Sequence, residues 1–257
     1  MSSPVFFCHY FRIFAKKNMN MMNRTSLFIV LACLCAMFFA SCRQAVPEPH
    51  EVIMGKVAIQ NGDLLFVGIP LDYHLSDSTG MDDAITSATG QEGAVNYIHV
   101  AILEVDENDS LWVIDATIKH GVDRHPFSVF LSDFTLKDGS CPVLEVKRLK
   151  DNVAADSYVK NAKTYLGRDY DMYFSPDNME QYCSELVRNA YTNGTDTYIF
   201  NEAPMNFKSA DGSFPPYWVE LFGLLGEPIP QGVMGTNPND MSKESCLERV
   251  GEMRMGE

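Results

Sequence analysis

Basic residues are scarce in this chain, since 20 of its 257 residues are Lys or Arg and 34 are Asp or Glu. The shortage is greater beyond residue 42, because residues 1–42 hold four of the basic residues and none of the acidic ones. The rest of the chain therefore has 16 basic and 34 acidic residues and a net charge of −18. A surface this acidic repels phosphate backbones, which argues against nucleic acid as a partner.

Acidic residues are absent from residues 1–41, and the apolar run there is short. A basic stretch is followed by 15 mostly apolar residues (26–40) and then by small residues, which is the layout of a secretory signal peptide. A helix that spans a bilayer needs about 20 apolar residues. We therefore expect residues 1–41 to be a signal peptide, with Met19, Met21 or Met22 as alternative starts of translation.

The apolar run ends in "FFASC", which resembles the lipobox of bacterial lipoproteins. That resemblance implies cleavage before Cys42 and lipidation of its thiol; the alternative is an ordinary secreted protein with a cysteine near the cut. Lipid chains would anchor the protein to a membrane without spanning it. We expect an envelope location, periplasmic or on the outer surface, with residues 42–55 as a tether.

Neither a CxxC motif nor a cluster of Cys and His is present, so the sequence gives no reason to expect zinc. Four cysteines remain after the signal: Cys42, Cys141, Cys183 and Cys246. With Cys42 lipidated, an odd number is left, so at least one thiol is free unless chains cross-link. Cys141 and Cys246 are a candidate disulfide in an exported protein.

Internal repeats and a βαβ alternation are also absent. About 210 residues follow the signal, enough for one domain, which we place at 56–250. The predicted order is strands, then two helices, then loops, which favours an α+β fold on an antiparallel sheet. We expect strands at 64–69, 95–105, 111–117 and 142–149, helices at 156–167 and 179–193, a short helix within 214–226, a polar loop at 74–94 with one helical turn or a short helix, and irregular chain at 227–241. In the helix at 156–167, Val159, Ala162, Lys163 and Leu166 lie on one stripe, with Lys163 at its margin.

Cys183, in "MEQYCSELVRNAY" (179–191), is a candidate nucleophile. It lies where an irregular stretch gives way to a helical pattern, and a helix N-terminus favours a thiolate and can receive a developing oxyanion. The alternative is structural. Cys183, Leu186, Val187 and Ala190 form one apolar stripe at helical spacing, and free cysteines are usually buried. The helix alone favours the structural interpretation.

A nucleophilic cysteine needs a base within hydrogen-bond reach. Five histidines follow the signal: His50, His74, His99, His120 and His125. We expect the first two in the tether and in a polar loop. The last two flank "GVDR" in what we interpret as a solvated connection, where a metal pair with Asp123 is a weaker alternative.

His99 is different, because it lies in the apolar strand "YIHVAIL", on the face shared with Tyr97, Ala101 and Leu103. A core histidine is one interpretation. The returning strand of the hairpin carries Asp115, which neighbouring antiparallel strands can place on the same face as His99. Asp115 would then hold one ring nitrogen and leave the other for the thiol; a strand-end residue bonded to backbone is its alternative.

At this point five segments resemble the permuted papain-like cysteine hydrolases of the YiiX/YebB type. They are "NGDLLFVG", "YIHVAIL", "WVIDAT…GV", "YLGRDYDMYF" and "QYCSELVRNAY", within about residues 56–192. In the NlpC-type cell-wall peptidases the Cys helix comes first; here it comes last and the other blocks keep their order, as circular permutation would produce.

The resemblance implies a curved antiparallel sheet with the Cys helix packed across it. It implies Cys183 as nucleophile, His99 as general base and Asp115 as the orienting acid, where relatives often have Glu. Its supporting residues are Gly62, Asp63 and Tyr182. The implied activity is hydrolysis of amide bonds in peptidoglycan-type peptides or N-acyl amides, without metal or cofactor. A lipid-directed acyltransferase or esterase of the same fold, or a non-catalytic surface lipoprotein, is the alternative.

Overall fold

The structure is a computed structural model that describes residues 51–70, 80–91, 94–136, 139–193 and 197–253. The predicted signal peptide, Cys42, His50 and His74 lie outside the described residues. Among the described residues, no helix is both long and apolar enough to cross a membrane. Residues 51–54, which the sequence placed in the tether, form a strand, β1, that pairs with β2 in a short hairpin.

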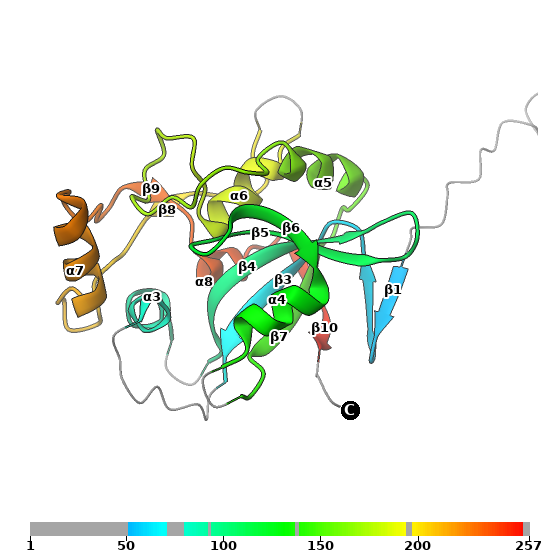
Figure 1. The fold of residues 1–257 in the computed structure, drawn as a ribbon, viewed down its shortest axis with the longest axis horizontal. Coiled ribbons are helices and arrows are strands. Elements are labelled where there is room, and N and C mark those ends of the chain that lie inside the picture. Colours follow the sequence, from blue (N-terminus) through cyan, green and yellow to red (C-terminus); the bar gives the residue numbers. More distant parts are fainter. Residues whose placement is uncertain (1–50, 71–79, 92–93, 137–138, 194–196, 254–257) are drawn as a thin grey trace, which may run out of the picture. The chain divides into compact units, whose positions relative to one another are not determined.

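The centre of the fold is a six-stranded antiparallel sheet in the order β10-β7-β3-β4-β5-β6 (Figure 1). The strands are β1 (Glu51–Met54), β2 (Val57–Gln60), β3 (Asp63–Ile69), β4 (Asn96–Val105), β5 (Leu111–Thr117), β6 (Gly121–Pro126), β7 (Val143–Leu149), β8 (Ala203–Pro204), β9 (Met234–Gly235) and β10 (Leu247–Met253). The predicted α+β fold on an antiparallel sheet is confirmed.

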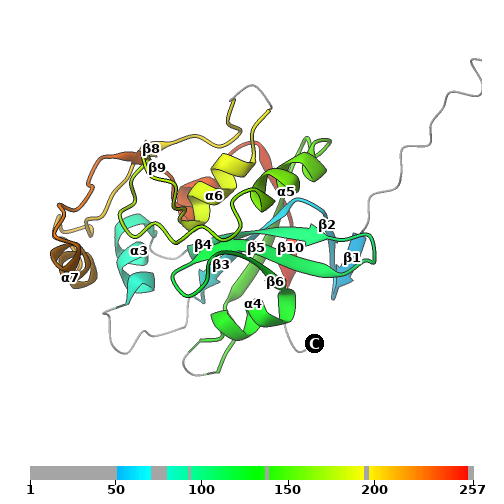
Figure 2. The ribbon, with the colours of Figure 1, turned by 45° about the horizontal axis from the view of Figure 1, so that its top comes forward.

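Helices cover both faces of this sheet. They are α3 (Met81–Thr89), α4 (Phe127–Phe134), α5 (Ala155–Lys163), α6 (Cys183–Ala190), α7 (Pro216–Leu225) and α8 (Pro238–Met241). Figure 2 shows α5 and α6 on one side of the sheet and α4 on the other. Because β3 is buried throughout and β4 almost so, their sequences are apolar runs rather than alternating patterns.

Two apolar layers result. The layer between the sheet and α5–α6 includes Phe66, Ile102, Leu186 and Val187. The layer on the α4 side includes Leu65, Leu103, Val113 and Phe130. A third, aromatic cluster lies beside α3 and α7 and includes Phe174, Phe207 and Trp218.

The turn before β3 fixes the end of the sheet next to α5. Gly62 has a φ of +76°, and a Cβ there would lie 3.0 Å from the Cβ of Ala155, so both conformation and space require glycine. Buried Asp63 accepts from the backbone N–H of Gln60 (2.8 Å) and from Arg148 (2.6 and 2.8 Å). The hydroxyl of Tyr191, just after α6, donates to the carbonyl of Gly62 (2.7 Å).

Several predicted boundaries differ from the structure. Helix α5 ends at Lys163 instead of residue 167, and Leu166, expected on its buried stripe, is 39% exposed. Lys163, expected at the margin of the stripe, binds the carboxylate of Glu104 (2.6 Å). Helix α6 ends at Ala190, and β9 and α8 lie in the chain expected to be irregular. The thiols of Cys141 and Cys246 are free rather than paired.

Candidate active site

Cys183 is the first residue of α6, with Tyr182 as the N-cap. The carboxyl group of Glu185 accepts from the backbone N–H of Tyr182 (3.3 Å), which holds the start of the helix. The first N–H groups of a helix have no partner within it, so they face whatever lies before Cys183. Leu186, Val187 and Ala190 are fully buried on the sheet. The apolar stripe therefore anchors the helix and fixes Cys183 at its front.

His99 on β4 and Asp115 on β5 form a buried pair, with 2.8 Å between His99 Nε2 and Asp115 Oδ2. In the pairing of β4 with β5, Val105 lies opposite Leu111 at one end and Ile102 lies opposite Ile114 at the other. His99 and Asp115 both lie beyond this second end. At this end of the two strands, Ile98, His99 and Ala116 line a cleft together with Cys183.

The face of β4 that carries His99 differs in part from the prediction. Ala101 and Leu103 belong to the α4-side layer, whereas Tyr97 belongs to the layer under α5 and α6. The cause is a register shift, because Val67 of β3 pairs with His99 and the next residue, Gly68, pairs with Tyr97. This bulge adds Ile98 to β4 and reverses the side to which Tyr97 points.

The pairing with Asp115 determines which nitrogen of His99 is available. Because Nε2 lies against Asp115, Nδ1 is the nitrogen left for Cys183. Burial by itself lowers the pKa of His99, but the charge of Cys183 and hydrogen bonds to Asp115 and Cys183 outweigh it and raise that pKa to about 10. An imidazolium that persists at neutral pH favours the thiolate next to it. The ring of Phe134 packs on His99 with centroids 4.6 Å apart.

His125 is the residue of this site that the sequence did not reveal. It is not in a solvated connection but on β6, opposite Val113, and is 6% exposed. Its Nε2 lies 3.8 Å from Asp115 Oδ1, the carboxylate oxygen that His99 does not use. Two histidines therefore flank one buried aspartate. The signal was present in the strand "GVDRHP", where the buried Val122 and His125 sit among more exposed neighbours.

Tyr182 and Cys183 line a cavity that His99 does not line. The hydroxyl of Tyr182 accepts from the backbone N–H of Thr236 (3.0 Å) and contacts the sulfur of Met205 (3.9 Å). Thr236 also donates from its side chain to the hydroxyl of Ser184 (2.9 Å). Residues near 205 and 236 are thereby tied to the first turn of α6.

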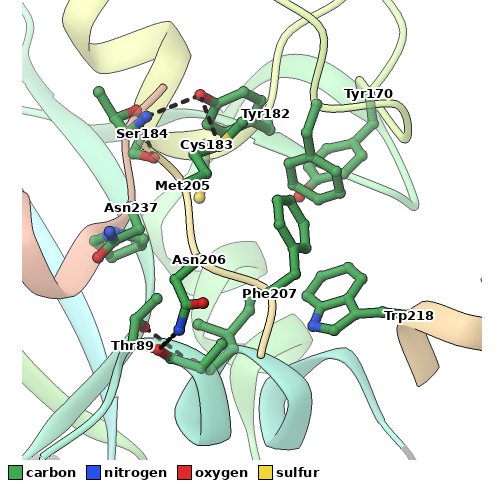
Figure 3. Close-up of a pocket in the computed structure, with 15 residues that line it drawn as sticks. Thr89, Tyr170, Tyr182, Cys183, Ser184, Met205, Asn206, Phe207, Trp218 and Asn237 are labelled. Carbon is green, nitrogen blue, oxygen red and sulfur yellow. Dashed lines mark hydrogen bonds between the residues drawn. The ribbon is translucent and has the colours of Figure 1, made fainter. Parts of the chain in front are cut away.

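Two cavities meet at Cys183. The first holds about 500 Å³ of empty space, including its opening, and aromatic and aliphatic side chains form most of its wall (Figure 3). The second, which we call the polar cleft, is wider, with about 950 Å³ of space including its opening. Apolar side chains form much of its wall, but unlike the first cavity it also has His99 and the polar groups of Lys119, Ser132 and Asp133. Ile85, Tyr170 and Cys183 line both cavities, whereas His99 lines only the second.

Metal ligands are not gathered at this site: within the part of the chain that the structure describes, no three His, Cys, Asp or Glu residues are placed to hold an ion. His120, considered above with Asp123, instead lies 3.0 Å from Asp133, which also binds Lys119 (2.6 Å).

The fold and the site together define a class of protein, the papain-like cysteine hydrolases, here with the Cys helix after the strands that carry His and Asp. Residues 58–251 match the family model described as "Permuted papain-like amidase enzyme, YaeF/YiiX, C92 family", and the chain belongs to this family. It is therefore a hydrolase of the cysteine peptidase and amidase type.

A solved structure has a similar fold. The metalloprotein YiiX from Escherichia coli O157:H7 is similar over 75% of this chain and 97% of its own, with a TM-score of 0.56 and 24% sequence identity. At that identity the likeness concerns the fold alone. A search of curated proteins found no match.

Glu185 gives the site a pH-dependent stability. Burial and the nearby Asp171 raise the pKa of Glu185 to about 8, although the N–H of Tyr182 opposes this. The folded state therefore keeps a proton that the unfolded chain, with an ordinary carboxyl pKa near 4.5, releases. The stability that this proton supplies is complete below about pH 4.5 and is lost as the pH rises through about 8.

We expect Glu185→Gln to reduce this loss, because glutamine keeps the acceptor for Tyr182 without the titration. Thermal unfolding at pH 5 and pH 8 should show a smaller difference in Tm for the variant, where about 1 kcal/mol corresponds to roughly 2–4 °C in a domain of this size. Glu248→Gln, at an exposed position, is the matched control and should behave as wild type. An unchanged difference in Glu185→Gln would contradict the assignment.

Proposed function

We propose that this protein is an envelope-anchored cysteine amidase that cleaves amide bonds through an acyl-enzyme, with Cys183 as nucleophile, His99 as general acid and base, and Asp115 as the residue that orients His99. The observation that carries the proposal is the 2.8 Å bond between His99 and Asp115, buried beside a cysteine at the first position of a helix. The substrates are small peptides of the peptidoglycan type or N-acyl amides.

Acylation follows from this arrangement. The Cys183 thiolate attacks the amide carbonyl carbon, and the oxyanion that forms faces the N-terminus of α6, where the N–H of Cys183 donates to it. The His99 imidazolium gives its Nδ1 proton to the leaving nitrogen. The C–N bond breaks, the amine departs, and the acyl group remains on sulfur as a thioester.

Deacylation reverses the proton transfer. Neutral His99 removes a proton from a water molecule, whose oxygen attacks the thioester carbon. The C–S bond breaks, the carboxylic acid leaves, and the thiolate–imidazolium pair is restored. Asp115 stabilises the imidazolium in each step and keeps Nδ1 toward the sulfur.

The envelope location is supported by the sequence of residues 1–42, with its signal layout and "FFASC" before the domain. Lipid on the thiol of Cys42 would hold the domain at a bacterial membrane by its N-terminus, as a periplasmic or outer-surface lipoprotein. The acidic composition argues against nucleic acid as a partner, so the proposed partners are a small substrate and, through the lipid anchor, a membrane.

Release of amine from defined substrates tests the proposal. The full-length protein in detergent is incubated with a muropeptide mixture and, separately, with N-hexanoyl glycine, and new primary amines are measured. We expect release from at least one class, and loss of that release after treatment with iodoacetamide. No release from either, or release that survives alkylation of Cys183, would contradict the proposal.

A further inference from the structure

We propose that the apolar cavity receives the acyl part of the substrate and that the open polar cleft receives the amine, so that the enzyme selects amides of apolar carboxylic acids. The inference rests on the proposed function, since it assumes that Cys183 attacks and that His99 protonates. It specifies on which side of Cys183 each half of the substrate binds, and the chemical class of the acyl group.

The direction follows from the position of His99. The group that protonates the leaving nitrogen must be within hydrogen-bond reach of it. His99 lines the polar cleft and is not among the residues of the apolar cavity, while Cys183 lines both. With the carbonyl carbon at the sulfur of Cys183, the amine therefore points into the cleft. The acyl group, on the other side of the carbonyl, enters the apolar cavity.

The class of acyl group follows from the walls of that cavity. Phe174, Phe207, Trp218 and Met205 contribute aromatic rings and a thioether, and none of the described residues that line the cavity is charged. Phe174 and Trp218 come from two segments of the chain, and Met205 and Phe207 from a third. Figure 3 shows Met205, Phe207 and Trp218 around the cavity. An apolar chain placed there would leave water at a gain of about 0.8 kcal/mol for each buried CH₂.

Polar side chains in the same wall are already engaged with the protein. The Thr89 hydroxyl donates to the carbonyl of Ile85 (3.0 Å) and accepts from Asn239 (2.9 Å). The Asn206 amide donates to the carbonyl of Ala88 (2.8 Å). Thr236 and Ser184 are bonded to each other as described above. These polar groups are therefore already hydrogen-bonded within the protein, whereas a hydrophilic acyl group would need them as its own partners.

A charged acyl group is disfavoured for the same reason. Burying a carboxylate without a partner costs several kcal/mol, and the cavity offers no cationic side chain among its described residues. The polar cleft differs in having charged groups among the apolar side chains of its wall: Lys119 and Asp133, which are paired with each other at 2.6 Å, can contact a polar amine part there.

The wild-type protein tests this with three esters that share one leaving group: p-nitrophenyl acetate, p-nitrophenyl hexanoate and mono-p-nitrophenyl succinate. Released p-nitrophenolate gives kcat/KM for each. We expect hexanoate to exceed acetate by about tenfold or more, since four added CH₂ groups enter the cavity, and succinate to fall below acetate. Equal values for hexanoate and acetate, or a preference for succinate, would overturn the inference.

Three variants locate the acyl group. Ala88 of α3 lines the apolar cavity, and Ala88→Phe fills part of it. Ser87 is exposed on the same helix, so Ser87→Phe is the matched control for a large side chain on α3. Ser132 lines the polar cleft, so Ser132→Phe probes the other side.

We expect the ratio of hexanoate to acetate to fall about tenfold in Ala88→Phe and to stay at the wild-type value in Ser87→Phe and Ser132→Phe. A fall in Ser132→Phe with no change in Ala88→Phe would reverse the direction and overturn the inference. The ester series on wild type decides the class of acyl group even where a variant fails to fold.

The two proposals fail in different ways. If Cys183→Ala hydrolyses all three esters as fast as wild type, the proposed function itself is wrong. If hydrolysis depends on Cys183 but shows no preference for hexanoate, the proposed function stands and the acyl site is wrong.

Discussion

Replacing Cys183 by alanine should abolish amide hydrolysis, with a fall in kcat of at least about 10⁴-fold. The variant has no atom that can form the thioester, so the direct attack of water is all that remains. Because Leu186, Val187 and Ala190 anchor α6, the fold should survive the loss of one sulfur. The rate is measured with the substrate found to release amine, and thermal unfolding is measured in parallel.

The control for this variant is Cys141→Ala, which removes an exposed free thiol elsewhere in the chain. It should leave the rate and the Tm at wild-type values. If Cys183→Ala keeps a substantial part of the wild-type rate, Cys183 is not the nucleophile.

Replacing His99 by alanine should lower kcat by about 10³- to 10⁴-fold, because both proton transfers lose their carrier. The dependence of the wild-type rate on pH tests the role of His99 independently. The imidazolium of His99 is held by the charge and hydrogen bond of Cys183 and by Asp115, against the effect of burial, with a pKa of about 10. As the pH rises through about 10 the proton is lost, so the rate of acylation should fall on the alkaline side.

His120→Ala is the matched control, since His120 is exposed and bonds Asp133 instead of the buried aspartate. It should keep both the rate and the alkaline limit. A rate in His99→Ala close to that of wild type, or an identical loss in His120→Ala, would contradict the role given to His99.

Local patterns were enough to predict the elements that carry the proposed catalytic residues. The hairpin of 95–117 combines two apolar runs with an acidic turn, and its pairing brought His99 and Asp115 together. The apolar stripe that begins at Cys183 predicted both the helix and its burial. These elements are stabilised by burial of one face, and the apolar residues of that face recur at a regular spacing in the sequence.

His125 and the apolar cavity were not predictable in the same way. The position of His125 beside Asp115 depends on the pairing of β6 with β5. β6 is a short strand, and its charged residues are typical of a loop. The cavity combines α3, the residues near 205 and the start of α7, which are far apart in the sequence. Contacts between these segments depend on tertiary packing, which leaves no regular spacing of residues in the local sequence.

Leu166 shows a third kind of limit. Its spacing fitted the stripe of α5, but the helix ends at Lys163, so Leu166 lies in the following turn and its side chain is exposed. Lys163 binds Glu104 at the edge of the sheet. Spacing predicts a face only while the helix continues, and helix ends are the least certain part of such a prediction.

The most direct test of the central claim, an activated thiolate at Cys183, compares two thiols in one molecule. Cys141 is exposed, whereas Cys183 is only 6% exposed, so accessibility alone predicts that iodoacetamide labels Cys141 faster. An activated thiolate predicts the reverse: at pH 7 Cys183 of the wild type should be labelled faster than Cys141, measured by peptide mass spectrometry over time. In His99→Ala, Cys141 should again be labelled faster. Slower labelling of Cys183 than of Cys141 in wild type, or no effect of His99→Ala on the order, would contradict the claim.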